Sequence, residues 1–392
     1  MYRLVQRRGI IGLFCLLFVA SSVVPGWAQK DNRFEVSKNL DIFNSLLKEV
    51  EMFYVDSVDV DKTVQRGIEA MLAGLDPYTE YYPEQKTEEL SLMTTGEYGG
   101  IGSLIRQRNN EGGVMIAEPT EGMPADLAGL KPGDLILAID TIDVSKATNS
   151  RVSELLKGVP NTKMVLTIQR PGEKKPRKFE ITRKQITTPQ VTYYGVKNDS
   201  IGYIYLKAFT IKSAQEVKEA FLDLKKNHNI KSLVLDLRGN GGGVLEGAVQ
   251  IVGMFVPKGS EVLSTKGKIK QWDRTYRTST EPLDTVMPLA ILINGGTASA
   301  AEIVSGSLQD MDRAVLVGQR SFGKGLVQAP RDLPYNGKVK ITMSKYYIPS
   351  GRCIQQIDYS HRKEDGSVAA IPDSLTSVFY TSKKHPVFPE PA

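Results

Sequence analysis

Apolar residues recur at three- and four-residue spacing along the chain after residue 33, and an Asp-Pro pair follows the second stripe. This spacing predicts amphipathic helices, and the Asp-Pro pair predicts where they stop. We therefore expect an N-terminal helical region over residues 33–94. Its apolar face could pack on its own domain or pair with another subunit. The apolar positions are Phe43, Leu46, Leu47, Val50, Phe53 and Tyr54, then Val64, Ile68, Met71, Leu72 and Leu75.

The pattern changes over residues 95–185, where short apolar runs are separated by glycine-rich turns. Such runs predict short strands joined by tight turns. A block of about 90 residues is also a usual size for one domain. The expected strands are 135–140, 165–169 and 178–182, with a short helix at 153–157.

Strand patterns alternate with helix patterns from residue 186 onward. This alternation predicts a layered α/β domain over residues 186–360, with helices covering a sheet. The remaining residues, 361–392, form a C-terminal tail whose proline-rich end we expect to be frayed from residue 383 onward. The expected strands are 201–209, 232–237, 289–294, 314–318 and 338–347, and the expected helices are 213–226, 245–255 and 299–311.

Residues 1–28 have the layout of a secretory signal peptide. Arg3, Arg7 and Arg8 precede an apolar run at 10–20, and small residues flank a cleavage point at the end of the segment. The run is shorter than the ~20 residues that a membrane span needs. We therefore expect an exported protein of the periplasm or cell envelope, which is membrane-associated if the segment stays uncut.

Charge and cysteine content narrow the classes of protein. Loss of residues 1–28 lowers the formal net charge from +6 to +3, because the segment holds three arginines and no acidic residue. The other basic residues are spread along the chain, which argues against nucleic acid as a partner. Cys353 would be the only thiol left, so no internal disulfide can form. No Cys/His cluster has metal-ligand spacing, and we expect no metal or other cofactor.

The histidines do not suggest a Ser-His-Asp triad. His228, His361 and His385 all lie in polar segments that we expect to be exposed. The role of proton acceptor then falls to another side chain, and lysine is the best candidate.

Ser299 follows a Gly-Gly-Thr-Ala turn and stands at the start of an expected helix. The first N–H groups of a helix lack partners and favour negative charge. The N–H of Ala300 could therefore stabilise an oxyanion formed when Ser299 attacks a carbonyl. The same segment also reads as a capping box, in which Ser299 only caps the helix and Glu302 reaches back.

A second glycine loop, Gly239-Asn240-Gly241-Gly242-Gly243, follows the strand at 232–237. Glycines let the backbone approach a ligand closely, so an N–H of this loop could be a second oxyanion donor. A phosphate-binding loop is disfavoured because it lacks Gly-Lys-Ser/Thr. A plain turn is the remaining alternative.

Lys324 lies in a glycine-flanked loop, where a lysine is usually a solvated surface charge. As a general base it would have to be neutral near pH 7, so its pKa would have to fall by about three units from ~10.4 through burial. Phe322 and Leu326 could supply apolar surroundings, and Gln328 could hold the amine by a hydrogen bond.

These motifs, in this order, resemble those of the C-terminal processing peptidases, also called tail-specific or carboxyl-terminal proteases, of the bacterial envelope. The resemblance implies an α/β multidomain chain with an N-terminal helical segment, a PDZ domain at 95–185 and a ClpP/crotonase-like layered α/β serine protease core at 186–360. It runs from about residue 38 to about residue 360 and is carried by Leu75–Tyr82, Pro124–Asp134, Asp236–Gly243, Gly295–Glu302, Gly323–Gln328 and Pro349–Arg352.

The resemblance implies a role for each matching residue. Ser299 would be the nucleophile, Lys324 the general base and Gln328 the residue that orients the lysine. Tyr78 stands where the family usually has a histidine, at a position without a catalytic role. The oxyanion hole would be formed by the N–H of Ala300 and that of Gly242 or Gly243.

A PDZ domain binds an extended peptide as an added strand and captures its terminal carboxylate in a nest of backbone N–H groups. The expected nest is Tyr98, Gly99, Gly100, Ile101 and Gly102, although a glycine-rich hairpin turn would have a similar composition. The resemblance also implies self-association through the N-terminal helices.

The sequence therefore predicts an exported serine endopeptidase that selects substrates by their C-terminal tails and cleaves them through an acyl-enzyme. The main alternative is a catalytically inactive, PDZ-containing scaffold that binds peptides. Many family members continue into a longer tail after the element that matches Pro349–Arg352, whereas the tail of this sequence is short. This difference keeps the inactive scaffold open as an alternative. An acyl-CoA enzyme is a weaker alternative, because it would have no use for a PDZ domain.

Overall fold

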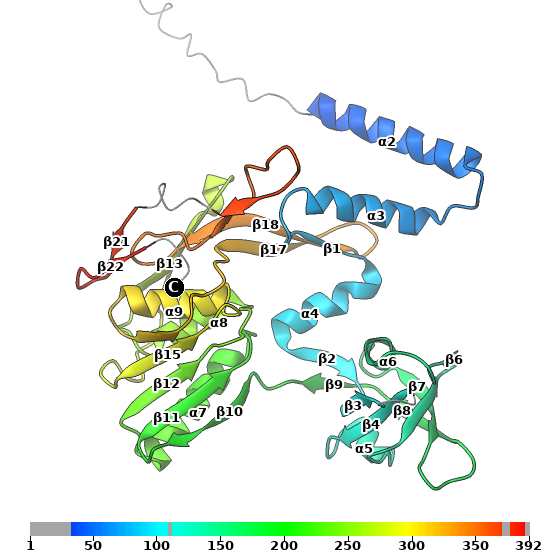
Figure 1. Ribbon diagram of the computed structural model, residues 1–392, viewed down its shortest axis with the longest axis horizontal. Helices are drawn as coiled ribbons and strands as arrows, with labels where there is room; N and C mark the ends of the chain where they lie inside the picture. Colours follow the sequence, from blue (N-terminus) through cyan, green and yellow to red (C-terminus); the bar gives the residue numbers. More distant parts are fainter. Residues whose placement is uncertain (1–32, 109–111, 371–376, 389–392) are drawn as a thin grey trace, which may run out of the picture. The chain divides into compact units, whose positions relative to one another are not determined.

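A computed structural model describes residues 33–108, 112–370 and 377–388 (Figure 1). The expected signal peptide at 1–28 lies outside the described residues. The chain divides into two compact units, residues 1–68 and 69–392.

The described part of the first unit is helical, as the apolar spacing predicts. It contains α2 (Arg33–Phe53) and most of α3 (Val60–Ala73). No residue of α2 is buried, and the side chains of Leu40, Phe43 and Leu46 are largely exposed. No helix in the described part of the chain is both long and apolar enough to cross a membrane.

The helical region predicted over 33–94 also contains a short strand. Asp76-Pro77 ends the second helical pattern, and β1 (Glu80–Tyr82) follows and pairs antiparallel with β18 (Lys338–Tyr347). A 3₁₀ turn, η1 (Glu84–Lys86), and α4 (Thr87–Thr95) come next. Gly96 ends α4 in the left-handed conformation, with φ of 71°, which glycine adopts without strain.

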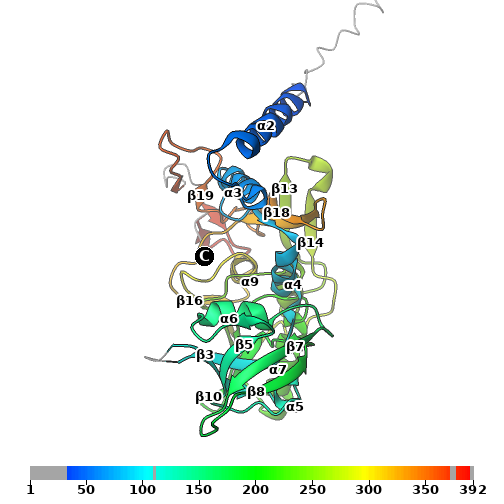
Figure 2. The same ribbon diagram turned by 90° about the vertical axis from the view of Figure 1, so that its right-hand side faces the viewer.

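The block at 95–185 forms an antiparallel sheet in the order β3-β4-β5-β7-β8, with β6 paired to β5. Helix α6 lies alongside this sheet (Figure 2). Strand β3 stands at an edge and has β4 as its only partner among the described strands. The elements are β3 (Ser103–Gln107), β4 (Val114–Pro119), α5 (Pro124–Leu127), β5 (Leu135–Ile139), β6 (Ile142–Asp143), α6 (Asn149–Leu156), β7 (Lys163–Gln169) and β8 (Arg177–Thr182).

A two-stranded ribbon joins the ends of this block. Strand β2 (Glu97–Gly100) enters the block, β9 (Lys184–Thr187) leaves it, and the two pair antiparallel. The sheet buries an apolar core of its own, which includes Val114, Ile116, Ile136, Leu166 and Ile168.

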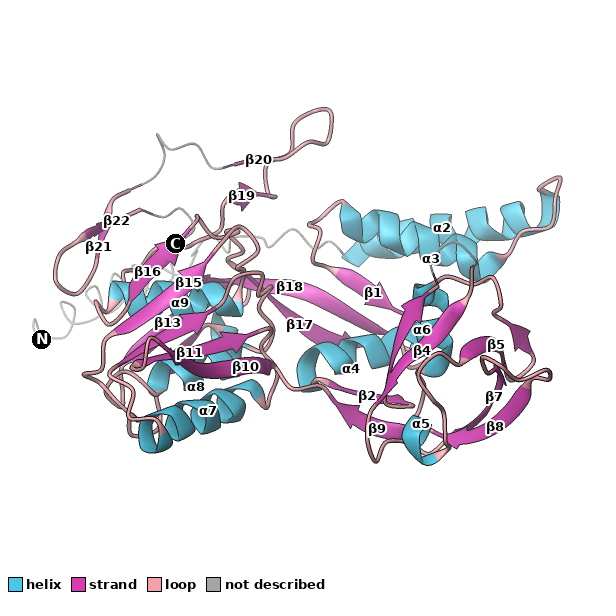
Figure 3. Cartoon of the chain, turned by 60° about the horizontal axis from the view of Figure 1, so that its bottom comes forward, coloured by secondary structure: helices cyan, strands magenta, loops and turns pink. Residues whose placement is uncertain are grey.

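The predicted α/β layer is present from residue 191 onward. Its sheet has the order β10-β11-β12-β15-β16, and all neighbours beyond β10 are parallel. Figures 1 and 3 show α7, α8 and α9 stacked along this sheet. The elements are β10 (Val191–Lys197), β11 (Ile201–Leu206), α7 (Ser213–Asn227), β12 (Ser232–Asp236), α8 (Leu245–Gly253), β15 (Leu289–Ile293), α9 (Ala300–Asp310) and β16 (Val315–Gly318).

A further sheet has the order β1-β18-β13-β14, with β17 on the other edge of β18. Strand β18 pairs with β1 along its first residues and with β13 along its last residues. Helix α9 contacts both β16 and β13, so it lies between the two sheets. The remaining elements of this layer are β13 (Glu261–Gly267), η2 (Lys270–Trp272), β14 (Arg274–Arg277) and β17 (Leu326–Asp332).

The last described residues are more ordered than the proline-rich sequence predicts. Two short hairpins, β19 (Ile357–Asp358) with β20 (Ala369–Ala370) and β21 (Phe379–Tyr380) with β22 (Pro386–Val387), follow β18. The N–H of Lys383 donates to the carboxylate of Asp312. The expectation of fraying from residue 383 is therefore wrong for the part up to residue 388.

Candidate active site

Ser299 lies at the junction between β15 and α9, in an unusual backbone conformation. Its φ is 55° and its ψ is −117°, a region that residues with a side chain rarely adopt. Such strain persists only where the surroundings hold it in place. Here Thr297 is buried and its hydroxyl donates to the Leu237 carbonyl, while the N–H of Ala298 donates to the Asn240 carbonyl. The serine turn is therefore tied to the second glycine loop.

Glu302 holds the backbone of Ser299 beside the backbone of Lys324. Its side chain is fully buried. Oε2 accepts from the N–H of Ser299 at 2.7 Å and from the N–H of Lys324 at 2.9 Å. Oε1 accepts from the Ser321 hydroxyl and the Gly323 N–H. Burial raises the pKa of Glu302, and these four donated hydrogen bonds act in the opposite direction.

The half of the capping box in which Glu302 reaches back to the Ser299 N–H is present, and Glu302 also organises the lysine loop. Tyr346 makes a matching connection on the carbonyl side. Its hydroxyl, on a side chain that is 1% exposed, lies 2.8 Å from the Lys324 carbonyl oxygen and 3.2 Å from that of Ser299. Two buried side chains therefore hold these two backbone segments side by side.

The Lys324 amine lies against an aromatic ring. Its Nζ is 4.3 Å from the centroid of the Tyr78 ring. Burial, aided by the nearby charge of Lys340, lowers the pKa of Lys324 to about 8, whereas Glu80, Asp76 and Glu302 act in the opposite direction. This decrease in the pKa is smaller than the three units that a lysine needs to be neutral near pH 7. The ring face of Tyr78 attracts the ammonium form and so also opposes deprotonation.

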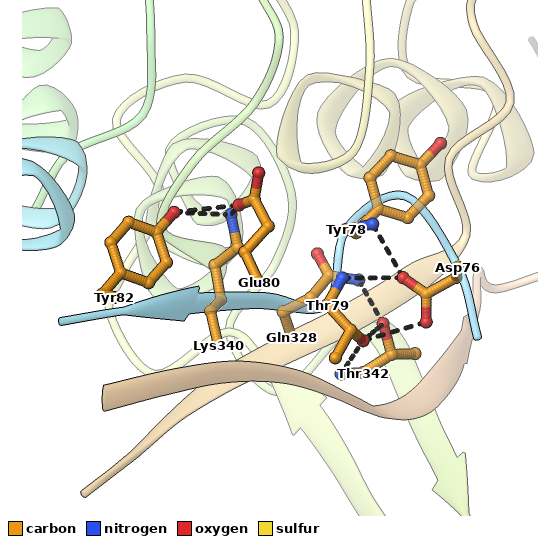
Figure 4. A network of polar contacts seen from close by, with 8 residues as sticks. All are labelled: Asp76, Tyr78, Thr79, Glu80, Tyr82, Gln328, Lys340 and Thr342. Carbon is orange, nitrogen blue, oxygen red and sulfur yellow. Dashed lines mark hydrogen bonds and ion pairs between the residues drawn. The ribbon is translucent and has the colours of Figure 1, made fainter. Parts of the chain in front are cut away.

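Gln328, the predicted partner of the lysine, is bound elsewhere. Its Nε2 donates to the hydroxyl of Thr342 at 3.1 Å. Neither Gln328 nor any other side chain of the described residues forms a hydrogen bond with the Lys324 amine. Gln328 lies on β17, and strand β18 separates it from the turn that contains Thr79. Its amide oxygen points away from Thr342 (Figure 4).

The two candidate glycines of the oxyanion loop differ. A Cβ at Gly242 would lie 2.8 Å from the Ser299 Cβ and 2.9 Å from the Ala300 nitrogen, so this loop touches the serine turn directly. The N–H of Gly242, however, already donates to Asn240 Oδ1. The N–H groups of Gly243 and Ala300 donate to no acceptor in the described ranges. Of the three candidate oxyanion donors, the N–H groups of Gly243 and Ala300 are therefore the two that could bind a ligand.

The five predicted nest residues fall into two sets. Tyr98, Gly99 and Gly100 belong to β2 and pair with β9. Ile101 and Gly102 lie between β2 and the edge strand β3, and their N–H groups bond to no acceptor within the described part of the chain. Ile101 is buried in the core of this block. Ile101 and Gly102 are therefore the two of the five that adjoin the open edge strand β3.

Sequence reasoning gave no weight to two of these neighbours. The sequence gives Tyr78 no catalytic role, and its ring lies against the lysine amine. Tyr346 belongs to no recognisable sequence motif. The pairing of β18 with its neighbours places its hydroxyl beside the carbonyl oxygens of Ser299 and Lys324. The three histidines are exposed, as predicted, with side-chain exposures of 52%, 86% and 69% for His228, His361 and His385.

Comparison with known proteins agrees with this architecture. The model of peptidase family S41 matches residues 200–360, and a PDZ domain model matches residues 115–170. A carboxy-terminal-processing protease of Bartonella bacilliformis is 36% identical over 345 residues, which cover 87% of this chain and 77% of that protein. A "Probable CtpA-like serine protease" of Staphylococcus aureus is 33% identical over 320 residues, covering 81% of this chain and 62% of that protein.

Among solved structures, a photosystem II D1 C-terminal processing protease shares 29% identity, covers 80% of this chain and 89% of its own, and has a TM-score of 0.45. The family assignment rests on the sequence relatives, because the match to the Bartonella protein extends over both the PDZ block and the α/β layer. The chain therefore belongs to peptidase family S41, as a serine-type C-terminal processing protease with a PDZ domain.

Proposed function

We propose that this protein is an exported endopeptidase that cleaves through a Ser299–Lys324 dyad and an acyl-enzyme. The observation that carries the proposal is the double connection made by Glu302 and Tyr346, which holds the two backbone segments together at both their N–H and their C=O groups. Neutral Lys324 would take the proton of Ser299 as the serine attacks a peptide carbonyl. The lysine would then protonate the leaving amine and activate the water for deacylation.

The oxyanion formed in each step needs preorganised donors. We assign this role to the N–H groups of Ala300 and Gly243, which have no protein acceptor within the described ranges. The N–H of Gly242 donates to Asn240. Gly242 would contribute instead through its lack of a side chain, which lets the glycine loop lie close to Ser299. All the named groups belong to this chain, and the proposed steps use no metal or cofactor.

We further propose that the PDZ domain selects substrates by their C-terminal tails. A peptide would add as a strand to the open edge of β3, and its carboxylate would meet the N–H groups of Ile101 and Gly102. The exposed apolar stripe of α2 favours self-association through the N-terminal helices. The composition of residues 1–28 supports export to the periplasm or cell envelope.

Covalent labelling and tail dependence test this function together. A fluorophosphonate, which reacts with activated serines, is expected to label the wild-type protein at Ser299, as identified by mass spectrometry of the labelled peptide. A peptide that ends in a free carboxylate is expected to be cleaved at least about tenfold faster than the same peptide as its C-terminal amide, because only the former offers the charge that the backbone nest binds.

Ser299→Ala is the control for both measurements and should be unlabelled and inactive. Label found on another serine, or cleavage by the Ser299→Ala protein, would remove Ser299 from the mechanism. Tail binding without any cleavage by the wild-type protein would favour the scaffold over the enzyme. Equal cleavage of the acid and the amide would remove the carboxylate from substrate selection.

The rate of cleavage is expected to rise with pH and level off above about 8. Lys324 must be neutral to accept a proton, and its pKa of about 8 leaves about one tenth of the lysine neutral at pH 7. The measurement is kcat/KM from about pH 6 to 10 with a substrate that has no group titrating in this range, since kcat/KM reports the free enzyme. A profile that is flat or falling across this interval would contradict a lysine base.

A further inference from the structure

The turn Asp76–Thr79 is held rigidly by its own carboxylate. Asp76 Oδ1 accepts from the N–H groups of Tyr78 and Thr79, each at 2.8 Å. Asp76 and Thr79 are 6% and 4% exposed. An aspartate that bonds to backbone two and three residues ahead stabilises a tight turn. The turn therefore presents its side chains in fixed directions (Figure 4).

A row of hydroxyl groups leads from this turn to Gln328. Thr79 Oγ1 lies 3.0 Å from Asp76 Oδ2 and 3.3 Å from Thr342 Oγ1. Thr79 Oγ1 also accepts from the N–H of Thr342. Gln328 Nε2 then donates to Thr342 Oγ1. Figure 4 shows these four side chains in one continuous group.

The direction of the hydrogen bonds follows from the proton inventory. An ionised carboxylate only accepts, so the single hydroxyl proton of Thr79 goes to Asp76. Thr342 must then donate its own proton to Thr79, and it has lone pairs left to accept from Gln328. The row therefore requires the nitrogen end of the Gln328 amide to face Thr342.

This orientation decides which end of Gln328 is left for the lysine. With Nε2 engaged, Oε1 points away from Thr342 and bonds to no other described residue (Figure 4). An amine carries N–H donors in both its neutral and its protonated form. The oxygen end of the amide can therefore bind the Lys324 amine in both states, whereas the nitrogen end would repel the ammonium.

We propose that Asp76, Thr79 and Thr342 are positioning residues for the cleavage reaction, and that they fix the Gln328 amide with its oxygen available to Lys324. The inference rests on the proposed Ser299–Lys324 mechanism. The same turn also carries Tyr78, whose ring contacts the lysine amine. The three residues come from the region before the PDZ domain and from β18, far in sequence from the nucleophile.

Thr342→Val tests the proposal, because valine keeps the shape and strand preference of threonine but removes the hydroxyl. We expect kcat to fall about tenfold with KM within about twofold, in line with the loss of an outer partner that orients an active-site group. Thr342→Ser, which keeps the hydroxyl, should restore kcat to within about threefold of wild type. In a Gln328→Ala background, Thr342→Val should have no further effect.

A second variant keeps the test informative if Thr342→Val is unstable. Thr79→Val breaks the same row one step further from Gln328, so a loss of kcat that disappears in the Gln328→Ala background is again expected. Equal losses in both backgrounds, or an unchanged kcat in both valine variants, would show that the row only stabilises the fold and would overturn the proposal.

Failure of the proposed function gives a different result. If Ser299 is not the nucleophile, the fluorophosphonate does not label it in the wild-type protein, whatever the threonine variants do. If the dyad is correct and only this inference fails, Ser299 is labelled at the wild-type rate in Thr342→Val. Retarded labelling in Thr342→Val, together with a normal rate in Thr342→Ser, is the outcome that the positioning role requires.

Discussion

Replacing Lys324 with arginine or methionine is expected to reduce kcat by about 10⁴-fold or more, the scale seen when one member of a catalytic unit is lost. Arginine keeps the positive charge but does not give up a proton in proteins. Methionine keeps much of the side-chain volume under the Tyr78 ring but has no amine. Both changes remove a neutral amine, so both should abolish peptide cleavage and Ser299 labelling.

The matched control is Lys345→Ala, which removes an exposed lysine from β18 and should leave kcat within about twofold of wild type, as expected for a surface change. Circular dichroism and thermal unfolding report whether each variant is folded. Full activity of Lys324→Arg would mean that the site needs a positive charge rather than a base. Activity in Lys324→Met would exclude the lysine altogether.

Gly242→Ala is expected to lower kcat by about 10²- to 10³-fold, because the new methyl group would displace the serine turn and with it the Ala300 N–H, and loss of one oxyanion donor has an effect of this size. The new Cβ would lie 2.7 Å from the Ala298 carbonyl oxygen and 2.8 Å from the Ser299 Cβ. These atoms belong to a turn that is held by buried hydrogen bonds, so the methyl group cannot be accommodated by moving a flexible side chain. Gly242 also has φ of 93°, where a side chain is strained.

Gly241→Ala in the same loop provides the control. No heavy atom lies within 4 Å of a Cβ placed on Gly241, and its φ is not in the left-handed region. Its kcat should therefore stay within about threefold of wild type. Comparable activity of the Gly242→Ala and Gly241→Ala proteins would show that the close approach of this loop to Ser299 does not matter for catalysis.

Local sequence patterns were sufficient for the parallel layer. The apolar runs that predict strands 201–209, 232–237 and 289–294 correspond to β11, β12 and β15. Buried parallel strands read as nearly continuous apolar runs, which makes them easy to recognise. The same reasoning missed β10, β13, β14 and β17, because these antiparallel strands carry many polar residues and depend on their partners for stability.

The segment around Asp76 shows a different limit. Its Asp-Pro pair correctly predicts the end of a helix. That β1 then pairs with β18, more than 250 residues later, leaves no trace in local spacing. The contact of Tyr78 with Lys324 follows from that pairing, so a residue discounted on resemblance alone lies beside the proposed base.

For this protein, the order of motifs alone established the family, the PDZ block and the candidate nucleophile and base, because those features depend on residue type and short-range spacing. The tertiary structure decided three further points. The backbone of Ser299 lies beside that of Lys324, the Gly242 N–H is already bound to Asn240 whereas the Gly243 N–H bonds to no described acceptor, and a row of hydrogen bonds connects Asp76 with Gln328. The first and the last of these depend on hydrogen bonds between segments that are distant in sequence, and such partners meet only when the chain has folded. The bond from the Gly242 N–H to Asn240 is local, but residue type and spacing alone do not reveal it.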